Sequence, residues 1–391
     1  MALDEIGVVM HGVTGRMGKT QHLIRSVLAL RDEGGVPLRD GRRIVPRPIL
    51  VGRNSDSLAQ LARAHNIPDW GPDIDAALAD PRASIFFDAG STIMRENLVE
   101  RALAAGKHVY TEKPLASTYD SALKLARSAK ARGKKHGVVH DKLWLPGLVK
   151  LKSLIDSGAL GRILSVKIDF GYWVFDGRAE AAQRPSWNYR SEDGGGIVLD
   201  MFPHWHYVIE NLFGRIDHVY CATKTQIAER VDERGQLYAA SADDEAHAIV
   251  ELETGAVVQI ASSWCTRVRR DDLAIFHVDG EKGSAVAGLT ELRFQPAAAT
   301  PRPVWNPDQA QQRDFYGDWL PCHADRSYDN AFRAQWALFI RHCVEDTPFP
   351  WNFFSAAAGV RFAETALQSA REKRQISLNA PQQGRAEALD Q

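Results

Sequence analysis

The feature that most constrains this fold is the alternation of short apolar strands with helical segments over roughly the first third of the chain. A strand is predicted at residues 6–10, and a helix over 19–31 follows it after a glycine-rich turn. Further strands are predicted at 45–51, 85–87 and 109–111, each followed by a helical pattern. Repeats of strand and helix in this order favour an α/β fold with a doubly wound sheet of parallel strands.

The pattern changes after about residue 142, where strands follow one another without helices between them. Residues 246–263 contain two strand-like runs around Glu-Thr-Gly, a sequence typical of a hairpin. Consecutive strands predict an α+β domain with an antiparallel or mixed sheet, and closing helices are predicted over 331–344 and 356–371. We therefore predict two domains, residues 1–141 and residues 142–391.

The composition excludes several classes of protein. Of the 391 residues, 45% are hydrophobic and 25% are charged, and 48 Lys and Arg nearly balance 49 Asp and Glu. A net charge of −1 provides no attraction to nucleic acid or to an anionic membrane, so we expect neither as a partner. No apolar run approaches the ~20 residues that span a bilayer, and no basic segment precedes the apolar stretch at the N-terminus. With four scattered cysteines and no CxxC pair, we predict no disulfide framework, no metal site and a cytoplasmic location.

The glycine-rich turn lies between the first strand and the first helix, where a dinucleotide site would begin. Its spacing is GxxGxxG, so small residues permit a tight turn and the close approach of a pyrophosphate to the helix N-terminus. A strand-to-helix turn without any ligand can have the same spacing. The residues predicted to contact the dinucleotide here are Gly12, Thr14, Gly15, Arg16, Met17 and Gly18.

The second predicted strand ends without the carboxylate that an NAD site commonly places against the ribose 2′-hydroxyl. Arg53 and Asn54 stand there instead, followed by Ser55. An arginine could pair with the 2′-phosphate of NADP, so NADP is slightly preferred over NAD as the predicted cofactor. A solvated surface arginine would give the same pattern.

Glu112-Lys113-Pro114 stands at the end of another predicted strand. Ligands of open α/β sheets bind beyond the carboxyl ends of the strands. A lysine at this edge can hydrogen-bond to a substrate hydroxyl and stabilise the alkoxide that forms as the carbon is oxidised. An ordinary surface lysine is the alternative interpretation.

The segment 194–206 begins with three glycines and contains one aspartate and two histidines. If the segment is helical, Asp200 and His204 are four residues apart on one face. An imidazole near a carboxylate suits general-base chemistry near neutral pH, whereas His206 on another face is predicted to have a structural role. A metal site that combines Asp200 and His204 with Glu112 is a further alternative, but it lacks a third local ligand.

Together these motifs resemble those of the glucose–fructose oxidoreductase/inositol dehydrogenase/MocA (Gfo/Idh/MocA) family of NAD(P)-dependent oxidoreductases. The resemblance rests on the glycine turn, on EKP at 112–114 and on GGGxxxDxxxH at 194–204. It extends to IDSGALGRI at 155–163 and HVDGEKGSA at 277–285. It implies an N-terminal Rossmann domain and a C-terminal α+β domain with a large open, mainly antiparallel sheet.

The sequence also departs from the family pattern. The turn lacks the usual GxG, and the residues DAGST at 88–92 replace a turn that more often contains Thr-Pro. Phe202 stands where the family often has glycine, and Tyr207 stands where it often has an acid. These departures concern the choice of substrate rather than the nucleotide chemistry.

The resemblance implies that Lys113 lies beside the nicotinamide, and that Asp200 and His204 hold the substrate and move its proton. Ser91, Glu112 and Lys113 join the predicted dinucleotide contacts. Aromatic faces stack on the C–H faces of sugars, although each nearby aromatic residue could equally belong to a hydrophobic core. The predicted substrate-binding residues are Lys113, Lys142, Trp173, Trp187, Arg190, Asp200 and His204.

We therefore expect a dehydrogenase that oxidises a secondary hydroxyl of a sugar, glycoside or cyclitol to a ketone, or catalyses the reverse reduction. One alternative is an NAD-dependent glycosidase that oxidises a ring carbon transiently and retains its cofactor. The other is a non-catalytic dinucleotide sensor, which would need neither Lys113 nor His204. Similar proteins also imply a homodimer or homotetramer formed through the uncovered face of the large sheet.

Overall fold

The structure of the chain is a computed structural model that describes residues 4–266, 272–300, 306–310, 314, 317–323 and 329–379. It divides into two compact units, one formed by Met1–Trp144 and Tyr328–Arg361 and the other by Leu145–Ser327 and Phe362–Gln391. The first unit therefore differs from the predicted first domain of residues 1–141, because it includes a segment from near the C-terminal end.

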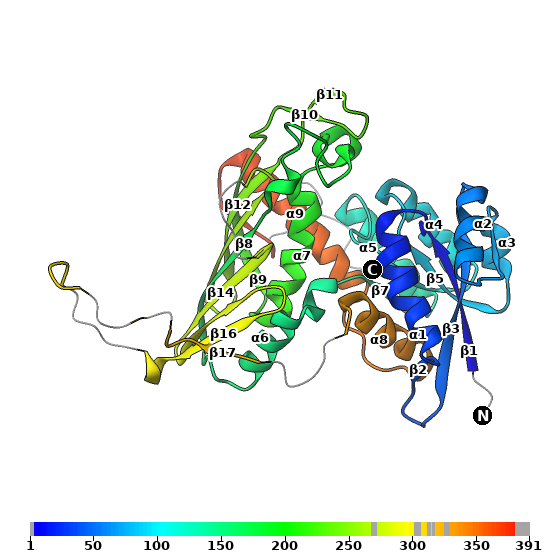
Figure 1. The fold of residues 1–391 in the computed structure, drawn as a ribbon, viewed down its shortest axis with the longest axis horizontal. Coiled ribbons are helices and arrows are strands. Elements are labelled where there is room, and N and C mark those ends of the chain that lie inside the picture. The colour runs from blue at the N-terminus through cyan, green and yellow to red at the C-terminus, as the bar shows by residue number, and fades with distance from the viewer. Residues whose placement is uncertain are drawn as a thin grey trace. The chain divides into compact units, whose positions relative to one another are not determined.

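The first unit is built on a largely parallel sheet, which has seven strands within the described residues (Figure 1). Its order is β2-β3-β1-β5-β6-β7, with β4 beside β3, and only β2 runs antiparallel to its neighbour. The chain thus leaves β1 toward one edge and returns to its other side at β5, so the carboxyl ends of β1 and β5 flank the switch point where such sheets bind ligands. The strands are β1 (Asp4–His11), β2 (Val36–Pro37), β3 (Arg43–Val51), β4 (Trp70–Gly71), β5 (Ala83–Asp88), β6 (His108–Thr111) and β7 (His136–Val138).

Helices cover both faces of this sheet. The helix predicted over 19–31 is a π-helix, η1, that continues as α1. The helices of this unit are η1 (Met17–Leu28), α1 (Ala29–Asp32), α2 (Ser55–Ala64), α3 (Ile74–Ala79), α4 (Thr92–Ala104), α5 (Tyr119–Ala131), η2 (Asp141–Trp144), α8 (Ala331–Glu345) and the first part of α9 (Phe353–Glu372).

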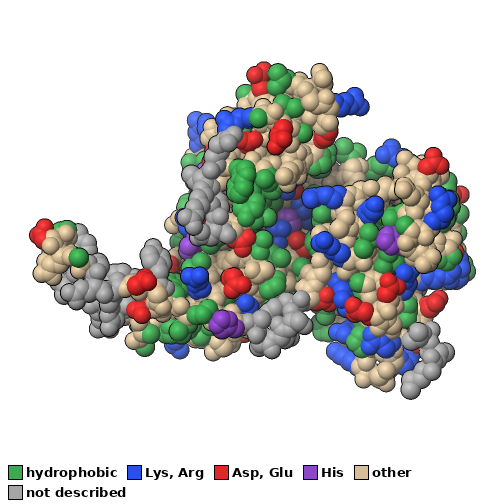
Figure 2. All heavy atoms as spheres, in the orientation of Figure 1, with side chains coloured by type: hydrophobic (Ala, Val, Ile, Leu, Met, Phe, Trp, Pro, Cys, Tyr) green, Lys and Arg blue, Asp and Glu red, His purple; other side chains and the backbone are tan. Residues whose placement is uncertain are grey.

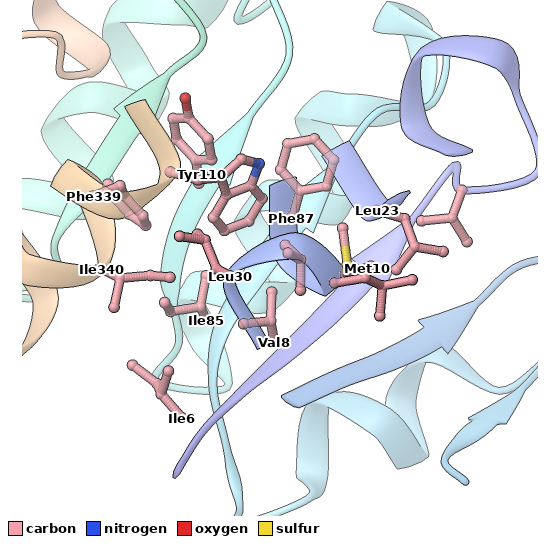
Figure 3. Close-up of a cluster of buried hydrophobic side chains, with 14 of the residues drawn as sticks. Ile6, Val8, Met10, Leu23, Leu30, Ile85, Phe87, Tyr110, Phe339 and Ile340 are labelled. Atoms are coloured by element: carbon pink, nitrogen blue, oxygen red, sulfur yellow. The ribbon is translucent and has the colours of Figure 1, made fainter. Parts of the chain in front are cut away.

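Helix α8 belongs to the first unit because its apolar side chains complete one of the two hydrophobic clusters there. Trp336, Phe339 and Ile340 are fully buried in this cluster with Met10 of β1 and Phe87 of β5. Figure 3 shows Phe339 and Ile340 in this cluster together with Tyr110 of β6. The predicted domain of residues 142–391 is therefore interrupted, since α8 packs with the parallel sheet.

The second unit is built on a large, mainly antiparallel sheet, which has nine strands within the described residues (Figure 1). Its order is β17-β16-β15-β14-β8-β13-β12-β9-β18, and β8 and β13 are its one parallel pair of described strands. The hairpin predicted at 246–263 is formed by β12 and β13. The strands are β8 (Ile163–Phe170), β9 (Ile216–Lys224), β12 (Glu245–Leu252), β13 (Val257–Ser263), β14 (Ala274–Gly280), β15 (Gly283–Ala287), β16 (Leu292–Pro296), β17 (Leu320–Pro321) and β18 (Ile376–Ser377).

Helices cover one face of the large sheet. α6 (Pro146–Asp156) packs on β15 and β16, and α7 (Ile197–Leu212) packs on β9, β12 and β13. The last part of α9 contributes Phe362, whose ring stacks 5.5 Å from that of Phe202. The smaller elements are β10 (Glu229–Val231), β11 (Leu237–Ala239), η3 (Trp173–Phe175), η4 (Ser186–Tyr189), η5 (Ser191–Asp193) and η6 (Ala297–Ala299).

The surface of each unit mixes charges of both signs, as the nearly neutral composition requires. Figure 2 shows Lys and Arg interspersed with Asp and Glu on the visible face of both units. In the described part of the chain, no helix combines the length and the apolar character needed to cross a membrane.

Candidate active site

The glycine turn after β1 packs tightly against the turn after β5. Gly12 has a φ of +77°, a left-handed conformation that favours glycine, and a Cβ there would lie 2.5 Å from the carbonyl carbon of Ala89. A Cβ on Gly18 would overlap the carbonyl oxygen of Gly12. A Cβ on Gly15 would meet only that oxygen, at 3.4 Å. Backbone packing therefore requires Gly12 and Gly18, whereas Gly15 faces more open space.

The N-terminus of η1 fits the pyrophosphate of a dinucleotide. Arg16 precedes the helix with helical φ and ψ, and its side chain makes no capping hydrogen bond. The N–H of Lys19 already donates to the carbonyl oxygen of Gly15 at 2.8 Å, so the N–H groups of Met17 and Gly18 are the ones that can donate to an anion. Ser91 occupies the corresponding N-cap position of α4, and its side chain makes no capping hydrogen bond either.

The end of β3 forms a shallow depression of about 550 Å³ lined by Arg53, Asn54, Ser55 and Asp56. Asn54 is committed to the fold, because its side chain caps α2 by accepting a hydrogen bond from the Ser57 N–H at 2.9 Å. Arg53 is exposed and forms no ion pair within the described part of the chain. A 2′-phosphate in this depression would therefore meet the guanidinium of Arg53, with the Asp56 carboxylate also in the lining.

A buried ionic network lies beneath the ends of β1 and β5. The Asp88 carboxylate accepts hydrogen bonds from Arg95 at 2.8 Å and from the Gly90 N–H at 3.0 Å, and it lies 2.7 Å from Nδ1 of His11. Arg95 also donates to the carbonyl oxygens of Gly90 and Pro114. Burial alone would raise the pKa of the Asp88 carboxyl, but the charge of Arg95 and the contact with His11 bring it below the usual value. The network ties the turns after β1, β5 and β6 together.

Glu112 fixes the backbone of Lys113. One carboxylate oxygen of Glu112 accepts from the Lys113 N–H at 3.0 Å, and the other lies 2.7 Å from Nε2 of the fully buried His22. Trp336 of α8 donates its indole N–H to Nδ1 of His22 at 3.0 Å, so the hydrogen of this imidazole lies on Nε2 and is donated to Glu112. Both carboxylate oxygens of the predicted dinucleotide contact Glu112 are therefore engaged by protein groups.

The pKa of Glu112 agrees with this arrangement. Burial raises the pKa of the carboxyl, but the hydrogen bond from His22 and the charges of Lys113 and Arg95 lower it below its ordinary value. A stable carboxylate at this position holds the Lys113 backbone at the carboxyl edge of the sheet. The peptide bond that follows, Lys113–Pro114, is cis. Lys142, in η2, lies with its amine 3.6 Å from the carboxylate of Asp141.

In the second unit, α7 begins at Ile197 on a cap supplied by Asp243. The carboxylate of Asp243 accepts from the Val198 N–H at 2.9 Å and its carbonyl oxygen accepts from the Ile197 N–H at 2.8 Å. Gly196 precedes the helix with a φ of +125°, and a Cβ there would lie 2.5 Å from the Asp243 carboxylate. The glycines before the helix therefore allow this cap, which positions Asp200 in the first turn.

Asp200 and His204 lie on the same helix, four residues apart as predicted. The Asp200 carboxylate forms an ion pair with Arg184, with 2.6 Å between Nη1 and Oδ2. Nδ1 of the buried His204 lies 2.6 Å from the hydroxyl oxygen of Tyr207. The tyrosine that departs from the family pattern is thus a hydrogen-bond partner of the predicted base.

His206 has the structural environment that the sequence predicts. It is buried, its ring lies 5.9 Å from that of Phe362, and Nε2 lies 3.5 Å from the Glu210 carboxylate. Burial lowers the pKa of this imidazole although the charge of Glu210 opposes the effect. A neutral, packed imidazole is therefore expected here at neutral pH.

The other predicted substrate contacts differ in their availability. Trp173 and Trp187 are both about half exposed. The Arg190 guanidinium instead stacks over the ring of Tyr238, 4.4 Å from its centroid, and lies 3.7 Å from the carboxylate of Asp193. These groups hold Arg190 in place, and its contact with the substrate stays a prediction.

Several residues that build these sites were not found from the sequence. These residues come from segments that are distant in the sequence, so no local pattern relates them to the site. Only Asp88 had a local signal, because it is a polar residue at the end of a predicted strand. These residues are His11, His22, Asp88, Arg95, Trp336 and Arg184. Among the described residues, no group of three or more His, Cys, Asp and Glu could hold a metal ion, and the predicted lack of a metal site stays a prediction.

Comparison with known proteins gives matches over most of the chain. A family model described as the oxidoreductase family with an NAD-binding Rossmann fold matches residues 6–140. A second, described as the GFO/IDH/MocA C-terminal domain, matches residues 148–286. Both predicted parts of the chain thus have a counterpart in one family of proteins.

Individual proteins are similar over nearly the whole length. A D-xylose dehydrogenase from Paenarthrobacter nicotinovorans is 49% identical over 377 residues, which cover 95% of this chain and 97% of the relative. A levoglucosan dehydrogenase from Pseudarthrobacter phenanthrenivorans is 25% identical over 284 residues, covering 69% and 70%. A solved levoglucosan dehydrogenase in complex with NADH and levoglucosan superposes with a TM-score of 0.78 at 20% identity, covering 97% of this chain and 100% of that chain, which shows a shared fold.

Proposed function

Because this chain belongs to the Gfo/Idh/MocA family of oxidoreductases, we propose that it oxidises a CH–OH group of an uncharged sugar with NAD(P) as cofactor. D-xylose is the first substrate to test. The observation that carries the proposal is the Glu112–His22 pair, which fixes the Lys113 backbone at the sheet edge that also holds the glycine turn. The 49% identical D-xylose dehydrogenase supports the choice of a pentose. The predicted secondary hydroxyl, and glycosides or cyclitols as substrates, form part of this proposal.

The reaction divides between the cofactor and the side chains. A bound nicotinamide dinucleotide would accept the hydride from the substrate carbon. We assign removal of the hydroxyl proton to His204, stabilisation of the developing negative oxygen to Lys113, and orientation of the substrate to Asp200. Each assignment follows from the family resemblance. For Asp200 and His204, the contacts with Arg184 and Tyr207 add support.

Tyr207 would position the general base. To receive a proton at Nε2, His204 must carry its hydrogen at Nδ1 and donate it to the Tyr207 oxygen, 2.6 Å away. The opposite arrangement, in which Tyr207 donates to Nδ1, leaves Nε2 protonated and unable to act as a base. The proposed mechanism therefore requires Tyr207 to accept this hydrogen bond.

An activity screen tests the proposed function directly. Purified protein with NAD or NADP is mixed with D-xylose, other pentoses, hexoses, cyclitols and aryl glycosides, and absorbance of the reduced nicotinamide is followed. A dehydrogenase accumulates reduced cofactor, whereas the alternative glycosidase releases the aglycone without net reduction. Product analysis then separates a ketone from the lactone that oxidation at the anomeric carbon would give. No reduction of either cofactor by any sugar would contradict the proposal.

Arg53→Asp should weaken NADP binding relative to NAD binding by roughly 1–3 kcal/mol, the scale of a charge-assisted hydrogen bond. The prediction follows from the exposed guanidinium of Arg53, which stands directly after the end of β3 in place of the acid that an NAD site commonly has there. Titration of both dinucleotides into both proteins measures the effect. An unaltered protein that prefers NAD would show that Arg53 does not select the cofactor.

We also expect a homodimer or homotetramer formed through the uncovered face of the nine-stranded sheet. Ile249 of β12 and Tyr220 of β9 are exposed and directly opposite each other in the strand register. Ile249→Glu should therefore shift the protein toward monomer in light scattering at micromolar concentration. Leu237→Glu, at an exposed position of β11 outside this sheet, is the matched control. A monomeric unaltered protein would contradict the prediction.

The predicted cytoplasmic location is also part of the proposal. All four cysteines are free thiols, and Cys221 is buried. Burial raises the pKa of the Cys221 thiol to about 12, so this thiol is protonated and unreactive at neutral pH. A protein with such cysteines suits a reducing compartment.

A further inference from the structure

The loop that precedes α7 places an arginine against the predicted substrate-binding aspartate. Nη1 of Arg184 lies 2.6 Å from the Asp200 carboxylate and 3.3 Å from the side-chain oxygen of Asn188. Asn188 is buried and donates its own amide hydrogen to the carbonyl oxygen of Pro185 at 2.9 Å. The arginine is therefore held at a defined place next to Asp200.

Two aromatic rings fix the plane of this guanidinium. Its central carbon lies 4.8 Å from the ring centroid of Trp264 and 5.3 Å from that of Phe175. Trp264 is fully buried, and Gln183 ties the loop down by donating its N–H to the carbonyl oxygen of Val174 at 2.9 Å. A planar cation stacked in this way loses little further freedom when it binds a ligand.

The pair retains exposed surface and unused donors. The Arg184 and Asp200 side chains are 20% and 18% exposed, whereas the Arg230–Asp244 pair in the same unit is completely buried. Nε of Arg184 is buried, whereas Nη2 makes no hydrogen bond within the described part of the chain and is the donor left for a ligand. The exposed part of the pair leaves room for a ligand to contact both side chains.

The chemistry of the pair indicates what that ligand is. The guanidinium donates hydrogen bonds and the carboxylate accepts them, so together they match two adjacent hydroxyl groups, one accepting and one donating. The two charges cancel, so the pair gives no net attraction to an anionic sugar acid, whose carboxylate Asp200 would repel. Resting on the proposed function, we propose that Arg184 and Asp200 together bind a vicinal diol of an uncharged sugar, and that Arg184 determines this specificity.

Binding to the full-length enzyme loaded with reduced cofactor tests the proposal without turnover. The probes are D-xylose, its 2-, 3- and 4-deoxy analogues, and D-xylonate, each titrated by calorimetry into wild type, Arg184→Gln and Arg178→Gln. Arg178 is the matched control, because it belongs to the same loop and pairs with Asp176 at 3.5 Å. Melting temperature and cofactor affinity are measured for every variant.

Wild type should bind D-xylose at least tenfold more tightly than the two analogues that lack a hydroxyl of the diol, and tenfold more tightly than D-xylonate. Arg184→Gln should bind D-xylose about 10- to 100-fold more weakly, the effect of losing a charged hydrogen bond. It should also lose most of the discrimination against one deoxy analogue. Arg178→Gln should behave as wild type, and cofactor affinity should be unchanged in both.

Three outcomes would overturn the inference. In the first, Arg184→Gln binds D-xylose as tightly as wild type does. In the second, the substitution weakens the affinity for D-xylose and for every deoxy analogue by the same factor, as a purely structural role predicts. In the third, wild type binds D-xylonate as tightly as D-xylose. A wild-type enzyme that binds D-xylose without oxidising it would contradict the proposed function instead, and the binding series would still decide the role of Arg184.

Discussion

His204→Asn should lower turnover of the sugar by about 10²- to 10⁴-fold, the usual contribution of a general base, while leaving dinucleotide affinity nearly unchanged. Oxidation of an alcohol requires that its proton leave as the C–H bond breaks. Imidazole, with an ordinary pKa of about 6.5, is the side chain best suited to accept that proton near neutral pH. Asparagine keeps a similar size and polarity but cannot accept the proton. Steady-state rates and dinucleotide titrations measure both effects.

Two further variants separate base chemistry from damage to the helix. Tyr207→Phe keeps the imidazole but removes the oxygen 2.6 Å from its Nδ1, so we expect a smaller loss of about 10- to 100-fold. His206→Asn alters a buried histidine of the same helix and should lower the melting temperature with little effect on the turnover of folded enzyme. Near-full turnover of His204→Asn would make Lys113 or Tyr207 the better candidate for the base.

Lys113→Met should also lower turnover by about 10²- to 10⁴-fold, because it removes the cation assigned to the developing negative oxygen. The substitution leaves the local backbone in place, since Glu112 accepts its hydrogen bond from the Lys113 main-chain N–H rather than from the side chain. Dinucleotide binding should therefore change little. Rates under saturating sugar and cofactor, together with cofactor titrations, distinguish a catalytic loss from a binding loss.

Lys124→Met, at an exposed position of α5, is the control for the loss of a lysine from the first unit. It should retain the rate and the cofactor affinity of wild type. If Lys113→Met turns over within about threefold of wild type, Lys113 does not stabilise the reacting oxygen, and the functional argument from the Glu-Lys-Pro corner fails.

The parts of the fold that could be predicted are the elements whose own residues show a periodic pattern or a turn sequence. The strand before Gly12, the hairpin at 246–263 and the helix at 331–344 each show their own period or turn sequence, and the structure contains all three. The apolar residues of 331–344 indicate a buried helix, but they carry no information about which sheet it covers. That choice depends on packing against Phe87 and Met10, which come together only in the folded chain.

The candidate site likewise contains residues that a local motif predicts and residues that it does not. Lys113, Asp200 and His204 belong to motifs and could be predicted as site residues, whereas the side chains that contact them could not. His22 is 90 positions from Glu112, and Arg184 lies in an irregular loop before Asp200. No periodicity relates such positions, and a histidine inside a helix or an arginine in a loop has many ordinary uses. The π-helical winding of η1 was also missed, because it changes the hydrogen-bond register without changing the residue pattern.

The indole of Trp336 has a consequence for how the protein is made. The first unit cannot complete its core during synthesis until α8 has left the ribosome, because Trp336 and Phe339 fill one face of the parallel sheet and Trp336 satisfies His22. A fragment ending at residue 141 would expose Phe87 and leave that imidazole nitrogen without its donor. The first unit is thus encoded in two pieces separated by residues 145–327, and we expect that the N-terminal piece moved alone into another protein would not form a complete core.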